Sequence, residues 1–71
     1  MSFKENKREL MIEMTAAYLE AAINKHKLNV ELYLSDSVAV AEHPDIMESI
    51  EVELGKMAEY HDKLEMLKEH F

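Results

Sequence analysis

The clearest pattern in the chain is an apolar stripe in its last third. Its members recur at the three- and four-residue spacing of one helical face: Ile46, Met47, Ile50, Leu54, Met57, Ala58, His61 and Leu64. The residues between them are nearly all charged. The pattern predicts an amphipathic helix over about residues 44–70, with Leu54 in the middle of its packed face and Glu53 outside that face.

The first half of the chain carries apolar residues on two helical faces, roughly 130–150° apart. One face comprises Leu10, Met11, Met14, Ala17, Tyr18, Ala21, Leu28 and Leu32. The other comprises Ile12, Ala16, Leu19, Ile23, Val30 and Leu34. A helix with two apolar faces needs two neighbours, and the rest of the chain offers only one more long helix.

Residues 28–34 fit two interpretations. Apolar residues alternate along this segment, and again at Val38 and Val40 after a short polar turn, as they do in β-strands. That alternative is an α-β-β-α chain with a short β-hairpin at 28–41. The turn lacks the Asn-Gly or Asp-Gly pair of tight hairpins, and the same apolar residues also extend both helical faces. We therefore predict that the first helix continues through residue 34.

The boundary between the two helices is well marked. Residues 35–37 are Ser-Asp-Ser, whose side chains compete with helical hydrogen bonds. Pro44 disfavours helical geometry at the residue before it. Asp45 followed by Glu48 is a candidate capping box for the second helix.

The expected fold is a single all-α domain over residues 1–71. It consists of a helix over about 5–34, a break over about 35–43 and a helix over about 44–70, folded as an antiparallel hairpin. A hairpin of this length buries little surface, and the absence of cysteine excludes stabilisation by disulfides. We therefore expect the hairpin to dimerise into a four-helix bundle.

Ten residues are expected in the core or the oligomer interface. They come from the stripe and from one face of the first helix: Met14, Tyr18, Ala21, Ile46, Met47, Ile50, Leu54, Met57, His61 and Leu64. Leu54→Asp is accordingly expected to dissociate or unfold the protein. Glu53→Lys is expected to change the free energy of unfolding by less than about 1 kcal/mol.

Charge narrows the range of partners. The net charge of −7 disfavours nucleic acid and anionic membrane surfaces, because binding to phosphates needs clustered Lys and Arg. The charged first nine residues do not resemble a signal peptide, and no apolar run is long enough to span a bilayer. A cytoplasmic protein is the simplest expectation.

Catalytic and metal motifs are missing from the sequence. No histidine has a glutamate three residues before it, as carboxylate-bridged di-metal bundles require. A single glycine rules out a glycine-rich phosphate loop. We expect no enzymatic activity, no cofactor and no metal, with His61 at the core edge and His26, His43 and His70 at the surface or in the loop.

These observations favour a small acidic protein-interaction or regulatory module that acts as a homo-oligomeric helical bundle. One alternative is a small subunit or inhibitor-like factor that docks on a different, basic protein. Another is a metal-binding bundle with sites shared between subunits.

Overall fold

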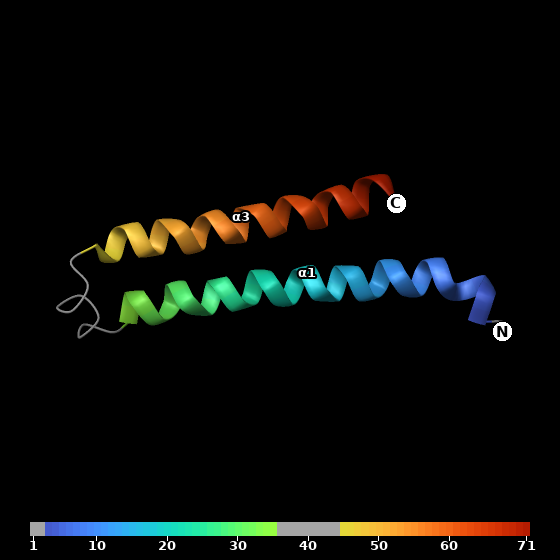
Figure 1. Cartoon of the computed structure of the whole chain (residues 1–71), viewed down its shortest axis with the longest axis horizontal. Coiled ribbons are helices and arrows are strands. Elements are labelled where there is room, and N and C mark those ends of the chain that lie inside the picture. The colour runs from blue at the N-terminus through green and yellow to red at the C-terminus, as the bar shows by residue number, and fades with distance from the viewer. Residues whose placement is uncertain (1–2, 36–44) are drawn as a thin grey trace.

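The computed structural model describes residues 3–35 and 45–71. This part of the chain forms two helices, α1 (Phe3–Ser35) and α3 (Ile46–His70), which pack against each other. The start of α1 and the end of α3 lie at the same end of the molecule, so the helices are antiparallel (Figure 1). The described residues contain no strand, which confirms the all-α hairpin.

Residues 28–34 belong to α1, which runs through them without a break. The helical interpretation of this segment is therefore confirmed, and the alternative in which it forms a β-strand is wrong. The second strand of that alternative, at 38–41, lies outside the described residues. α1 ends at Ser35, whose Oγ donates a hydrogen bond of 2.8 Å to the carbonyl oxygen of Glu31.

α3 begins without the predicted capping box. Asp45 is the N-cap residue, but its side chain makes no capping hydrogen bond. Its backbone angles, φ −98° and ψ 40°, lie outside the extended region that capping residues usually adopt. Its carbonyl oxygen accepts a bond of 3.0 Å from the Ser49 amide, and Glu48 lies in the first turn, where the helix dipole favours an acid.

The helices meet along one seam in which steps of three and four residues alternate. On α1 the seam consists of Ile12, Ala16, Leu19, Ile23, His26, Val30 and Tyr33. On α3 it consists of Ile46, Ile50, Glu53, Met57, Tyr60, Leu64 and Leu67. This is the spacing of coiled coils. Leu19 and Leu64, only 7% and 8% exposed, are the buried hydrophobic residues of the described part of the chain.

The hairpin is an elongated body of 57 × 20 × 12 Å. Its radius of gyration is 16.9 Å, whereas a compact domain of this length would have about 11 Å. Its accessible surface is 5800 Å², against about 4,600 Å² for a compact monomer of the same mass. A single chain thus exposes roughly 1,200 Å² more surface than a compact fold would.

Gly55 gives a simple test of the α3 assignment. It lies in the helix interior, and a Cβ atom added there would meet nothing within 4 Å. Alanine restricts the unfolded chain more than glycine and favours helix, so Gly55→Ala should stabilise the protein by about 0.5–1 kcal/mol. Chemical denaturation followed by circular dichroism measures this change, and a lower stability would contradict an uncrowded helical Gly55.

Candidate functional site

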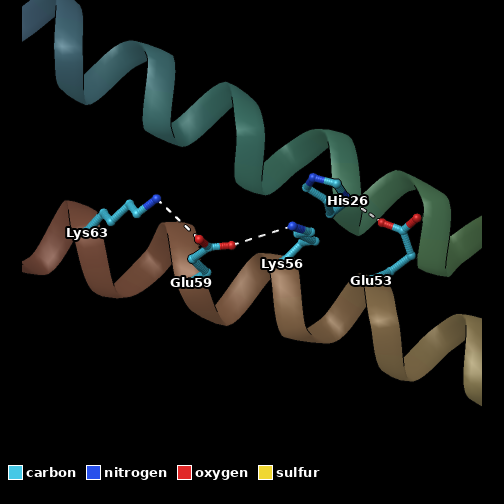
Figure 2. Close-up of polar contacts among 5 residues, drawn as sticks. All are labelled: His26, Glu53, Lys56, Glu59 and Lys63. Atoms are coloured by element: carbon cyan, nitrogen blue, oxygen red, sulfur yellow. Dashed lines mark hydrogen bonds and ion pairs between the residues drawn. The ribbon is translucent and has the colours of Figure 1, made fainter.

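A polar cluster interrupts the apolar seam. His26 on α1 and Glu53 on α3 point toward each other across the seam, with their side chains 15% and 18% exposed (Figure 2). The Nδ1–H of His26 donates a hydrogen bond to Oε2 of Glu53. The side-chain amide of Asn29 donates a second bond, of 3.2 Å, to Oε1 of the same carboxylate. Both carboxylate oxygens therefore have partners from α1.

Tyr60 extends this cluster along α3. Its ring stacks on the His26 ring, with the centroids 5.9 Å apart and the planes inclined by 12°. The Nζ atom of Lys63 lies 5.2 Å from the Tyr60 ring centroid and 3.3 Å from Oε1 of Glu59. Lys56 approaches the other oxygen of Glu59 at 3.8 Å (Figure 2). These lysine–glutamate pairs are exposed and add little stability.

Two expectations from the sequence are wrong at this cluster. His26 is not a surface residue, and Glu53 does not lie outside the packed face. The polarity of the two residues favours surface positions, but their spacing places both of them in the seam. His26 lies three residues after Ile23, and Glu53 lies three residues after Ile50, so each occupies a coiled-coil core position.

The pKa of the Glu53 carboxyl is lowered from its ordinary value, chiefly because His26 donates a hydrogen bond to it. Burial opposes this shift by raising the pKa. The hydrogen bond from Asn29 and the electrostatic attraction of His26 and Lys25 lower it further. The folded hairpin therefore favours the ionised form of Glu53.

This shift gives a pH dependence of known sign. A carboxyl whose pKa is lower in the folded state stabilises the protein above its unfolded pKa of about 4.5, and that stabilisation is lost as the pH falls through the folded value. From about pH 6 to pH 3, the melting temperature of the wild type should fall more than that of Glu53→Gln. Glu59→Gln, on the exposed side of α3, is the control and should follow the wild type. If the melting temperatures of all three proteins fell equally with pH, ionised Glu53 would not stabilise the folded hairpin.

One of the two apolar faces of α1 packs against α3, and the other lies on the side away from α3. It also follows alternating steps of three and four residues, about 150° around the helix from the seam. We call it the outer face of α1, and its members are Met11, Met14, Tyr18, Ala21, Lys25, Leu28 and Leu32. All seven are exposed, and the five large apolar side chains are each more than half exposed.

The exposed surface of α3 carries more charge. Its acidic residues are Glu48, Glu51, Glu59, Asp62, Glu65 and Glu69, and they lie beside exposed apolar side chains at Met47, Val52, Leu54 and Met66. The two helices therefore differ, because the apolar residues exposed on α1 follow one coiled-coil face, whereas those of α3 are interspersed with acidic residues.

The ten residues expected in a core or an oligomer interface fall into three groups. Ile46, Ile50, Met57 and Leu64 lie in the seam between the helices. Met14, Tyr18 and Ala21 lie on the outer face of α1. Met47, Leu54 and His61 are exposed along one flank of α3, where His61 Nε2 lies 3.7 Å from Oε1 of Glu65.

A long-range hydrogen bond joins the two ends of the described chain at the open end of the hairpin. Arg8 Nη2 donates to the carbonyl oxygen of Phe71 over 2.9 Å. Next to this bond is a shallow apolar hollow lined by Met11, Ile12 and Leu67. Met11 also belongs to the outer face of α1, so the hollow continues that face to the end of the hairpin.

No family model, curated protein or solved structure matches the chain. Within residues 3–35 and 45–71, no helix is long and apolar enough to cross a membrane. In the same two segments, no three histidine or acidic side chains are grouped so that they could hold a metal ion.

Proposed function

We propose that this protein is a small protein-interaction module that acts as a homo-oligomeric helical bundle, with the outer face of α1 as its binding surface. One observation carries the proposal: a complete coiled-coil face on α1 that α3 does not cover. Coiled-coil faces of this spacing bind other helices, because their side chains insert between those of a helical partner.

The amount of exposed surface supports a second copy as the partner. A stable protein–protein interface buries about 800 Å² on each partner. The hairpin exposes roughly 1,200 Å² more than a compact protein of its mass, which is enough for one such interface. Pairing through α1 would bring four helices together, and the charged outer sides of α3 would stay in water.

The distribution of charge is consistent with this arrangement. A net charge of −7 and the acidic outer side of α3 disfavour nucleic acid as a ligand. The same acidic side favours a basic protein as the second candidate partner. The chain would then be a small subunit or inhibitor-like factor that docks on that protein. The proposal requires no cofactor and assigns no catalytic step.

The mass of the protein in solution tests the proposal. At micromolar concentration, light scattering after gel filtration should give about twice 8.3 kDa, or a larger multiple. Dilution should lower the mass toward that of one chain, as it does for a reversible complex. A folded species of 8.3 kDa at all concentrations would contradict a homo-oligomeric module.

A further inference from the structure

We infer that two copies pair through their outer α1 faces in an antiparallel orientation, and that Lys25 sets this orientation. The inference rests on the proposed function and adds a direction to it. Among the seven members of the outer face, Lys25 is the charged one. A charge within an otherwise apolar coiled-coil face can select the orientation of the two helices. An orientation that buries the charge away from water is disfavoured.

Parallel pairing would be unfavourable at this position. Two identical helices that run in the same direction and in register place each residue of the face beside its own copy. The two Lys25 ammonium groups would then lie in one layer of an apolar interface. Like charges in that position repel each other, and burial removes part of their hydration.

Antiparallel pairing separates these charges. The outer face extends from Met11 to Leu32, and its midpoint lies near Ala21. Full overlap of two antiparallel copies offsets the two Lys25 residues along the helix axis by about 10 Å. Each Lys25 then lies near the level of Tyr18 in the other copy. Its carbon stem can pack on the apolar face while its ammonium group reaches water or the ring of that tyrosine.

Spin labels can read the orientation directly. The chain has no cysteine, so single cysteines can be introduced and labelled selectively. Glu13, Glu20 and Lys27 are exposed and lie outside both the seam and the outer face. They are spaced by seven residues, so they share one position relative to the outer face. Glu13→Cys, Glu20→Cys and Lys27→Cys therefore differ mainly in their height along α1.

Pulsed electron paramagnetic resonance on the labelled full-length proteins gives the label-to-label distances. For antiparallel pairing we expect axial offsets of about 25 Å at position 13, 15 Å at position 27 and 5 Å at position 20. The measured distances should therefore be longest for Glu13→Cys and shortest for Glu20→Cys. Three equal distances would overturn the antiparallel inference and leave the proposed function intact. No dipolar coupling in any variant, together with a mass of 8.3 kDa, would instead refute the proposed function.

The part played by Lys25 has its own test. Lys25→Leu removes the like-charge repulsion and makes parallel pairing accessible. In the Glu13→Cys background, this substitution should add a second, shorter distance to the one seen with Lys25 present. An unchanged single distance would show that Lys25 does not set the orientation.

Discussion

Replacing Leu64 by aspartate is expected to abolish the cooperative unfolding of the hairpin. Leu64 is 8% exposed and packs in the seam, where an unpaired carboxylate costs several kcal/mol. A single core of this size supplies only about 3–5 kcal/mol of stability, so the substitution removes most or all of it. Thermal denaturation followed by circular dichroism at 222 nm should show a low helical signal and no sigmoidal transition.

Leu54→Asp is the matched control, because it makes the same substitution on the same helix. Leu54 is 50% exposed and lies outside the seam, so the change in unfolding free energy should stay below about 1 kcal/mol. Glu53→Lys should be the more harmful of the two neighbouring substitutions, since it removes the acceptor for His26 and Asn29. This reverses the order expected from the sequence. If Leu54→Asp and Leu64→Asp lost the same amount of structure, the placement of Leu64 inside the seam and Leu54 outside it would be wrong.

Replacing Leu28 by glutamate is expected to dissociate the oligomer without unfolding the hairpin. Leu28 lies on the outer face of α1 and is 59% exposed in the single chain, so the charge costs little there. In an interface the same charge would be buried beside apolar groups. Burying this charge should cost about 3 kcal/mol of binding free energy, which raises the dissociation constant of the dimer by more than 100-fold. Light scattering at micromolar concentration should then give 8.3 kDa.

Val52→Glu is the control for that experiment. Val52 is 57% exposed, close to the value for Leu28, but it lies on α3 among the acidic residues. The variant adds the same charge to an exposed apolar position and should keep the mass of the wild type. If both variants dissociate, general charge repulsion is the cause. If neither does, the outer face of α1 is not the interface.

The helices themselves could be predicted from the sequence because local signals define them. The apolar periodicity and the polar break gave helices over about 5–34 and 44–70, against Phe3–Ser35 and Ile46–His70 in the structure. Residues 28–34 could be assigned to helix because their apolar residues continue both faces of α1. The prediction of a capping box is wrong because a cap depends on the backbone angles of Asp45, which residue types alone do not define.

The partner of each face could not be predicted in the same way. Periodicity identifies two apolar faces on α1, but it does not say which of them α3 covers. That choice depends on the register between the helices, which brings together His26 and Glu53, residues far apart in the sequence. The spacing places each of these residues in a seam, but their pairing is visible only once the register between the helices is known.

The outer face of α1 as the contact between two copies is the central claim, and nuclear magnetic resonance can test it directly. A sample that mixes isotope-labelled and unlabelled chains reports only contacts between different copies. The methyl groups of Met14 and Leu28 should show such contacts, whereas those of Val52 on α3 should show none. Contacts between copies that arise only from α3, or none at concentrations where the protein is folded, would contradict the claim.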